Sequence, residues 1–274
     1  NFVLHQPLRR FVRQLILPNM RQISNLTYFF WVYFMLIFLG ACKNQEVNGH
    51  KLIKGPDSSY TINNALESDP SQEKIIAPYR DSLEKTMDRV IGHSENVMVK
   101  GKPQGPLGNF VTGLMLERLR GKHGKKVDFA MTNNGGLRSI MPKGEVTVGD
   151  VYEVMPFDNE VVILEMSPEK MQALLRHFDQ KSIMAVSGVQ LGLENGKFRF
   201  LNINGTGFDP DKTYFMATND YLANGGDNMV FLKDVPAGQT GILLRDMIID
   251  FIEAKTKAGQ SIKAETDDRI KIHN

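Results

Sequence analysis

The pattern of apolar and polar positions divides this 274-residue chain into three regions. Residues 26–39 form an almost unbroken apolar run, and residues 43–72 are polar with no sustained hydrophobic period, as in a tether. From residue 73 onward, apolar residues recur at the spacing of helices or strands. The folded domain is therefore expected to span residues 73–274.

Within this domain, the helical period predicts four helices and one short helical turn. The helices are expected over residues 73–92, 107–119, 168–178 and 240–259, and the turn over residues 151–154. Pro78 is expected to kink the first helix or to lie in its first turn, and Ser167 is a candidate N-cap of the third.

Short apolar runs bounded by turn residues predict the strands. They are expected over residues 96–99, 127–131, 145–148, 161–166, 213–220 and 267–273, with a further pair inside residues 182–203. That pair flanks Asn195-Gly196, the strongest short hairpin signal. Helices and strands mix without strict alternation, so the predicted class is α+β, a layered mixed β-sheet domain covered by helices.

Composition and charge narrow the function classes. The chain is 42% hydrophobic and 23% charged, which is ordinary for a globular protein. Its net charge is +2, and its basic residues are scattered rather than gathered with aromatics into a stripe, so no nucleic-acid partner is expected. With the single cysteine Cys42, the chain can form neither an internal disulfide nor a thiolate metal cluster.

The apolar run near the amino terminus is similar to the core of a signal peptide. It is short for a transmembrane helix, and it ends in Leu39-Gly40-Ala41-Cys42, which resembles the lipobox of a bacterial lipoprotein. Residues 1–19 are then a non-native upstream extension, residues 20–42 the signal peptide, and Cys42 the site of lipidation. The protein is expected at the bacterial cell envelope, lipid-anchored and facing the periplasm or the surface. An uncleaved membrane anchor helix is the alternative.

Most catalytic patterns are missing from the sequence. The six histidines stand singly, and no H-x-x-x-H pair, G-x-S-x-G elbow or Walker A loop occurs. The sequence therefore predicts no catalytic residue, no metal ligand and no cofactor for this chain.

The stretch "TNNGGLRS", residues 132–139, is the first of two loops that indicate a binding site. It follows the apolar run 127–131 directly. Asn and Gly tolerate positive φ, glycine lets backbone approach a ligand closely, and Arg138 can hold an anion. By itself, the stretch also fits an ordinary turn followed by a solvated arginine.

Aromatic and acidic residues strengthen this hypothesis. Phe157 follows a proline in a turn, and Tyr221 and Asp227 lie in the Asn- and Gly-rich stretch 218–228, after another predicted strand. Two rings on facing loops can clamp a planar group, which is worth about 1–3 kcal/mol per stacked base. An aspartate can accept hydrogen bonds from sugar hydroxyls, and an arginine beside backbone N–H groups can hold a phosphate.

Several stretches together resemble a known family, over about residues 75–273 and in consistent order. They are similar to the carboxy-terminal, substrate-binding domain of the 5′-nucleotidase / UDP-sugar hydrolase family. The stretches are "PLGNFVTGLML", "NNGGLRSIMPKGEVTVGDVYEVMPFDNEVVILEMS", "AVSGVQLGL" and "TYFMATNDYLANGGDN". The resemblance implies the fold of that domain and a nucleotide or nucleoside ligand.

The resemblance also implies a role for each candidate substrate-binding residue. Phe157 and Tyr221 would sandwich the nucleobase. Asp227 would bind the ribose hydroxyls, and Asn159 would lie near the base. Contacts to the phosphate and the reaction zone are implied for Asn133, Gly135, Gly136 and Arg138.

This sequence departs from the family pattern at several positions. Asn134 stands where a third glycine is common, and Gly113 where an aspartate is frequent. Before the L-G-N helix, where the family has an arginine and a glutamate, this chain offers Lys100, Lys102 and Gln104. Lysines can still contact phosphate, but as point charges without the bidentate fork of arginine.

The family's amino-terminal domain is a dinuclear metallophosphoesterase, and its D-x-H and G-N-H-E/D motifs find no match in these 274 residues. The resemblance therefore implies the nucleotide-recognition subunit of a split 5′-nucleotidase, with divalent metals on a separate metallophosphoesterase chain. Two alternatives stay open: a non-catalytic cell-surface lipoprotein that binds nucleosides or nucleotides, and a structural module whose site has decayed.

Overall fold

The computed structural model describes residues 69–180 and 184–273, all within one structural unit, Glu67–Asn274. The upstream extension, the signal peptide with Cys42 and most of the tether lie outside the described residues. None of the helices in the described part combines the length and the apolarity that crossing a membrane requires.

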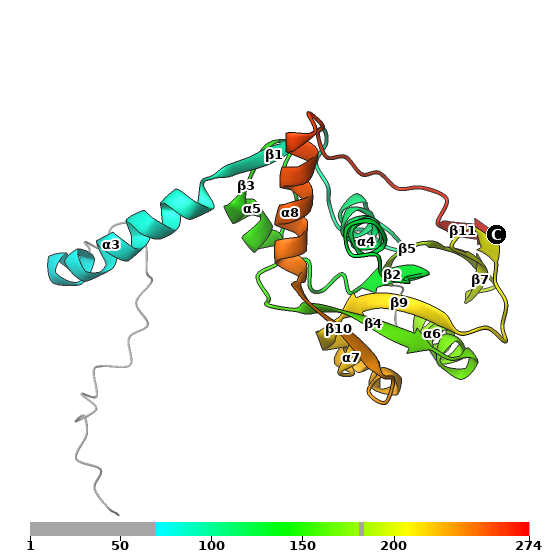
Figure 1. Cartoon of the computed structure of the whole chain (residues 1–274). Helices are drawn as coiled ribbons and strands as arrows, with labels where there is room; N and C mark the ends of the chain where they lie inside the picture. Colours follow the sequence, from blue (N-terminus) through cyan, green and yellow to red (C-terminus); the bar gives the residue numbers. More distant parts are fainter. Residues whose placement is uncertain (1–68, 181–183, 274) are drawn as a thin grey trace, which may run out of the picture. The chain divides into compact units, whose positions relative to one another are not determined.

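A five-stranded mixed sheet forms the middle layer (Figure 1). Its strand order is β10 (Ala237–Leu243), β4 (Glu160–Met166), β9 (Tyr214–Asn219), β2 (Phe129–Thr132) and β5 (Ala185–Ser187). Neighbouring strands are antiparallel except β2 and β9, which are parallel. The mixed sheet and its covering helices confirm the predicted α+β class.

Successive side chains of these strands point to opposite faces and feed two cores. Ala130 and Val161 belong to one core, whereas their neighbours Phe129 and Val162 belong to the other. The first core is covered by α4 (Pro106–Glu117), α5 (Val148–Val154) and α8 (Leu244–Lys257). The second is covered by α6 (Pro168–Gln180) and α7 (Asp220–Ala223).

Two smaller sheets complete the unit. The four-stranded sheet has the order β11 (Ile270–His273), β6 (Val189–Glu194), β7 (Lys197–Ile203) and β8 (Thr206–Gly207). The two-stranded sheet pairs β1 (Val90–Ser94) with β3 (Gly144–Thr147). The predicted hairpin is confirmed, because Asn195 and Gly196 join β6 to β7 with φ of 51° and 73°.

In the described part of the chain, the remaining helical segments are one long helix and three short turns. Helix α3 (Pro70–Met87) precedes β1, and it contains Pro78. A π-helical turn, η1 (Arg118–Lys122), continues α4. Two 3₁₀ turns, η2 (Gly226–Asn228) and η3 (Val230–Leu232), follow α7.

Several predicted boundaries are wrong, for reasons that lie outside the local sequence. The strand expected at residues 96–99 forms earlier in the chain, as β1, because Val90–Ser94 pairs with β3. Within residues 96–99, Met98 makes only an isolated bridge to Met141. The same pairing ends the first helix at Met87 rather than at residue 92. The last helix starts at Leu244, because residues 240–243 belong to β10 and Gly241 has a φ of 69°, which a helix excludes.

Candidate functional site

The loops singled out in the sequence meet at one edge of the five-stranded sheet. Because β2 and β9 are parallel, their last residues, Thr132 and Asn219, reach the same edge. β4 is antiparallel to β9 with Val161 opposite Asn219, so the turn that carries Phe157 enters β4 at this edge. Tyr221 stands in α7, directly after β9. The topology thus places both rings at the ends of neighbouring strands.

Both rings are open to solvent at this edge. Phe157 is 43% exposed and Tyr221 is 45% exposed, which leaves ring surface available to a ligand. The guanidinium carbon of Arg138 lies 6.0 Å from the centre of the Phe157 ring. The Asn-Gly loop (residues 133–138) and the Phe157 turn therefore share one surface.

The Asn-Gly loop does not use the left-handed backbone that its residues tolerate, since none of residues 133–136 has a positive φ. Gly136 is needed for space instead, because a Cβ there would lie 3.0 Å from Asn133 Oδ1. Arg138 closes the loop by donating from Nη1 to the carbonyl oxygen of Gly135 at 3.2 Å.

A buried asparagine joins the two loops from beneath. Asn219 is fully buried and caps α7, where its Oδ1 accepts the N–H of Leu222 at 2.9 Å. Its Nδ2 donates to Asn133 Oδ1 and to Thr132 Oγ1, both at 3.1 Å. Asn133, only 5% exposed, therefore supports the loop from inside. A satisfied buried network of this kind fixes the two loops relative to each other.

The second loop holds its tyrosine through an aspartate. The Tyr221 hydroxyl donates to Asp227 Oδ1 at 2.9 Å and accepts the Asp227 N–H at 3.2 Å. Gly226 lies against the ring, since a Cβ there would come within 2.5 Å of Tyr221 Cε1. The loop thus sets the tilt of the ring and places a carboxylate beside its hydroxyl.

An arginine from the start of α8 anchors the turn that carries Phe157. The side chain of Arg245 is 8% exposed; it pairs with the carboxylate of Asp158 and donates to the Phe157 carbonyl oxygen at a long 3.5 Å. Its guanidinium carbon lies 4.2 Å from the centre of the Tyr152 ring. This buried guanidinium gives an exposed turn a fixed support.

The other predicted residues have fewer defined contacts. Asn159 lies between the Phe157 turn and β4, and its carbonyl oxygen accepts the N–H of Leu244 at 2.8 Å. Lys100 and Lys102 are exposed in the segment that precedes α4. Helix α4 itself approaches the Asn-Gly loop at Gly108. The role of the two lysines at a phosphate stays a prediction.

Sequence reasoning missed Arg245 and the supporting role of Asn219. A signal for Arg245 was present, because it lies on the α8 face that also carries the buried Leu244 and Ile248. Arginine is rarely buried unless it is paired, so such a position indicates a specific partner.

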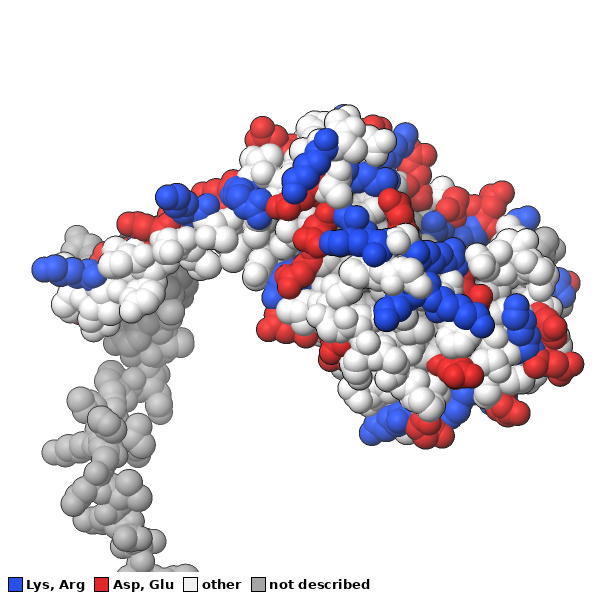
Figure 2. All heavy atoms as spheres, in the orientation of Figure 1, with Lys and Arg blue, Asp and Glu red and all other residues white. Residues whose placement is uncertain are grey.

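Within the described residues, this edge holds no cluster of metal ligands. Within residues 69–180 and 184–273, no group of three or more His, Cys, Asp and Glu side chains could hold a metal ion. This part of the chain therefore offers no ligand set for the dinuclear centre that the resemblance implies for an amino-terminal domain. Figure 2 shows side chains of both signs interspersed over the face in view.

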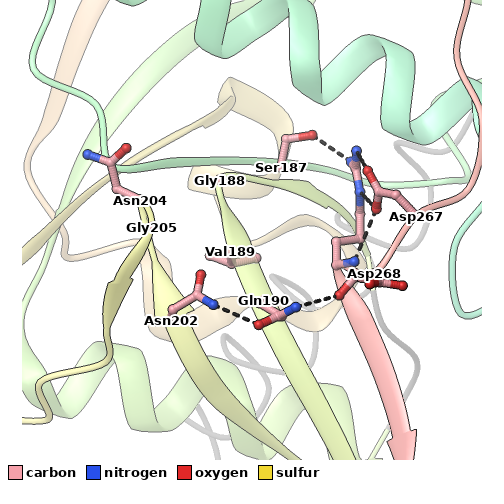
Figure 3. A pocket seen from close by; sticks show the side chains of 10 residues that line it. Ser187, Gly188, Val189, Gln190, Asn202, Asn204, Gly205, Asp267 and Asp268 are labelled. Carbon is pink, nitrogen blue, oxygen red and sulfur yellow. Dashed lines mark hydrogen bonds and ion pairs between the residues drawn. The ribbon is translucent and has the colours of Figure 1, made fainter.

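A polar cleft of about 480 Å³ lies beside β6 and β7 (Figure 3). Its polar side chains bond to one another: Arg269 donates to Ser187 Oγ at 2.6 Å and pairs with Asp267 at 2.7 Å. Asn202 donates to Gln190 Oε1 at 2.7 Å. The hydrogen bonds from Arg269 hold the pKa of the Asp267 carboxyl below its ordinary value. A ligand would have to replace these bonds, so the cleft is the weaker candidate site.

The fold and its loops define an α+β domain, in which a mixed sheet gathers exposed aromatic and polar groups at one edge. The family described as "5′-nucleotidase, C-terminal domain" matches residues 90–234, more than half of the chain. The chain belongs to this family, and the resemblance seen in its sequence is confirmed. The matched span includes the Asn-Gly loop, both rings and Asp227.

Known proteins agree with this assignment. The chain is 24% identical to a 5′-nucleotidase of Vibrio cholerae, over 82% of this chain and 40% of that protein. It is 26% identical to protein UshA of Yersinia enterocolitica, over 69% of this chain and 35% of that protein. The solved 5′-nucleotidase precursor of Thermus thermophilus, 26% identical, matches with a TM-score of 0.62 over 74% of this chain and 43% of that one. The chain thus spans less than half the length of these relatives.

Proposed function

We propose that this domain recognises a nucleotide or nucleoside by clamping the base between Phe157 and Tyr221. The observation that carries the proposal is the shared sheet edge, where both rings are close to half exposed, Phe157 in a turn and Tyr221 in α7, at the ends of neighbouring strands. Stacking accepts any planar base and contributes about 1–3 kcal/mol per base. The matched relatives named as 5′-nucleotidases support a ligand of this class.

The polar groups around the rings suit the rest of a nucleotide. The Asp227 carboxylate uses Oδ1 to fix Tyr221, and a carboxylate has further acceptor positions for ribose hydroxyls. Arg138 is exposed beside the Phe157 ring, where its fork can hold a phosphate. Lys100 and Lys102 add positive charge as point charges.

Hydrolysis of the phosphoester, in this proposal, needs a dinuclear metallophosphoesterase on a separate chain. Support comes from residues 69–180 and 184–273, which offer no metal-ligand cluster. This chain then supplies recognition for nucleotide catabolism, and a lipid on Cys42 attaches it to the bacterial cell envelope.

Calorimetry and a phosphatase assay test both parts of the proposal. Adenosine, AMP and UDP-glucose are titrated into the full chain in detergent, and at least one is expected to bind. With Mn²⁺ present, the chain by itself should release no phosphate from AMP, and release should appear when a metallophosphoesterase chain is added. Failure of all three ligands to bind contradicts the recognition proposal, and full activity of the single chain contradicts the separate-chain proposal.

A second function, non-catalytic capture of nucleosides at the cell surface, is favoured by one observation. The positive groups predicted for the phosphate are a single arginine, Arg138, and the exposed lysines Lys100 and Lys102. If capture is the function, adenosine should bind as tightly as AMP. A clear preference for AMP over adenosine would favour the nucleotidase proposal.

A further inference from the structure

The connection between α4 and β2 is a strongly basic turn, residues 118–126. Its sequence, RLRGKHGKK, contains five Lys and Arg residues, one histidine and no acid. The exposed members are Arg120, Lys122, Lys125 and Lys126. Leu119, the one large apolar residue of the turn, is fully buried. The surface of the basic turn is therefore almost purely cationic.

Backbone hydrogen bonds close the basic turn. It begins as the π-helical turn η1, where the His123 N–H donates to the Arg118 carbonyl oxygen at 3.1 Å. Gly124 then takes a left-handed φ of 57°, and the Lys125 N–H donates to the Leu119 carbonyl oxygen at 2.8 Å. The charged side chains therefore extend from a hydrogen-bonded turn, and π-helical turns are frequent at functional sites.

Carboxylates neutralise little of the charge in the basic turn. Within the described residues, Lys122 is its one member that forms an ion pair, with Asp250 at 3.0 Å. Arg118 and Arg120 instead donate to backbone carbonyl oxygens, at 2.5 to 2.8 Å. A carbonyl oxygen fixes a guanidinium in place but does not cancel its charge, which stays available to an outside anion.

The contact of Lys126 with Phe215 indicates which kind of partner fits. The Lys126 ammonium nitrogen lies 4.3 Å from the centre of this half-buried ring, so the cation already occupies the ring face. Single-stranded nucleic acid needs exposed rings for its bases, and the centre of a protein interface needs apolar anchors. The basic turn offers neither. A layer of anionic lipid headgroups needs only positive charge near its surface.

The position of the basic turn also suits a membrane. The turn leads into β2 at Phe129, whereas the Asn-Gly loop leaves β2 after Thr132, so the two lie at opposite ends of this strand. A membrane surface at the basic turn would leave Phe157 and Tyr221 on the side away from the bilayer, open to a nucleotide. A lipid on Cys42 would keep the domain close to such a surface.

We propose that the basic turn docks the domain on a membrane surface of anionic phospholipid. The cationic groups are Arg118, Arg120, Lys122, Lys125 and Lys126. The proposal rests on the proposed function only for the lipid attachment, and it adds an orientation of the attached domain. Docking of this kind is electrostatic, so salt weakens it.

The test measures energy transfer from the full chain to vesicles that contain an acceptor lipid. A donor dye is attached to an azidophenylalanine in place of Gly121, where a Cβ meets nothing within 4 Å. The vesicles are phosphatidylcholine, without or with about 30% phosphatidylglycerol. Transfer should be at least about twofold greater with phosphatidylglycerol in about 0.1 M NaCl, and the difference should vanish in about 1 M NaCl. Equal transfer to both kinds of vesicle overturns the proposal.

Charge reversal at two lysines without an ion pair sharpens the test. Lys125→Glu combined with Lys126→Glu should lower the ratio of docked to undocked chains at least about tenfold, because each lysine near an anionic surface contributes a factor of about five. Lys125→Gln combined with Lys126→Gln should give a smaller loss in the same direction. An unchanged ratio in variants that melt at the wild-type temperature overturns the proposal.

A matched control makes the same change in net charge elsewhere. Lys143→Glu combined with Lys197→Glu replaces two exposed lysines outside the basic turn, and it should alter docking less than about twofold. Equal losses in this control and in the Lys125→Glu, Lys126→Glu variant would show that net charge, not the basic turn, governs docking, and would overturn the proposal.

Two further outcomes separate this proposal from other partners and from the proposed function. If a labelled duplex DNA binds the chain more tightly than the phosphatidylglycerol vesicles do, and charge reversal in the basic turn abolishes that binding, the turn serves nucleic acid and the proposal fails. If transfer to phosphatidylglycerol vesicles depends on the lipid concentration, the chain is not attached to the vesicles; the lipid attachment then fails and the docking surface stands.

Discussion

The sheet edge with Phe157 and Tyr221 and the cleft beside Arg269 are both polar and both open, yet they are built in opposite ways. In the cleft, the half-buried side chains that line the opening bond to each other, as Asn202 does to Gln190. At the edge, the decisive bonds lie beneath the surface, through the buried Asn219 and Arg245. The rings above these supports stay exposed.

The difference teaches that the partners of the exposed polar groups are a better guide to a binding site than the volume of a cleft. Where polar groups satisfy one another, a ligand gains little, because each new bond replaces one already made. Where buried groups hold exposed side chains in place, a ligand meets them already oriented and loses less entropy on binding.

The largest expected effect tests the rings against the cleft. Phe157→Ala combined with Tyr221→Ala should weaken adenosine binding at least about 30-fold, because each stack contributes about 1–3 kcal/mol. Asn202→Ala combined with Asn204→Ala, in the cleft, should leave the affinity unchanged. Isothermal titration calorimetry measures both. An equal loss in the two variants would remove the distinction between edge and cleft.

The next effect concerns the buried support of the loops. Asn219→Ala should lower the free energy of unfolding by about 2–4 kcal/mol, because it removes the cap of α7 and leaves buried partners unsatisfied. Urea unfolding measures it, with Asn202→Ala as the control at about 1 kcal/mol or less. A loss in Asn219→Ala no larger than in the control would show that the edge is not supported from beneath.

A smaller effect is expected from the anchor of the Phe157 turn. Arg245→Ala should weaken adenosine binding by about 3- to 10-fold, because the turn loses its ion pair and its backbone contact. Arg245→Lys should restore part of the affinity through the charge pair. Arg199→Ala, which breaks an exposed pair with Glu194, is the matched control and should change nothing. Binding that is insensitive to Arg245→Ala would contradict its positioning role.

The smallest effect is a pH dependence in the cleft. Because Arg269 lowers the pKa of Asp267 below its ordinary value, the pair stabilises the fold at pH above that ordinary value and loses its effect as pH falls through the lowered pKa. Asp267→Asn should therefore reduce the melting temperature slightly at neutral pH, and the difference should vanish in strong acid. Adenosine affinity should not change. A melting-temperature difference that grows on acidification would contradict this assignment.

The sequence predicted those parts of the fold that depend on residues adjacent in the chain. The Asn195-Gly196 hairpin follows from the backbone freedom of two residues, and the loops after the strands at 127–131 and 213–220 follow from their turn residues. The candidate rings Phe157 and Tyr221 came from a combination of motifs, and their exposure agrees with the role assigned to them. Their roles at a ligand stay predictions.

Long-range pairing could not be predicted in the same way. The parallel pairing of β2 with β9 brings two distant loops to one edge, and nothing in either segment specifies its neighbour. The pairing of β1 with β3 overrode an otherwise helical period at residues 88–92. The contact of Arg245 with Asp158 likewise depends on where β10 ends and α8 begins.

The close contact between Gly226 and Tyr221 joins the smallest residue of the loop to one of its largest. A single methyl group at position 226 would act as a wedge, because it would press on the ring from below at 2.5 Å. Such a wedge would tip the aromatic plane, and it would strain the two hydrogen bonds between the Tyr221 hydroxyl and Asp227. The missing side chain at position 226 therefore governs both the tilt of the ring and the position of the carboxylate beside it.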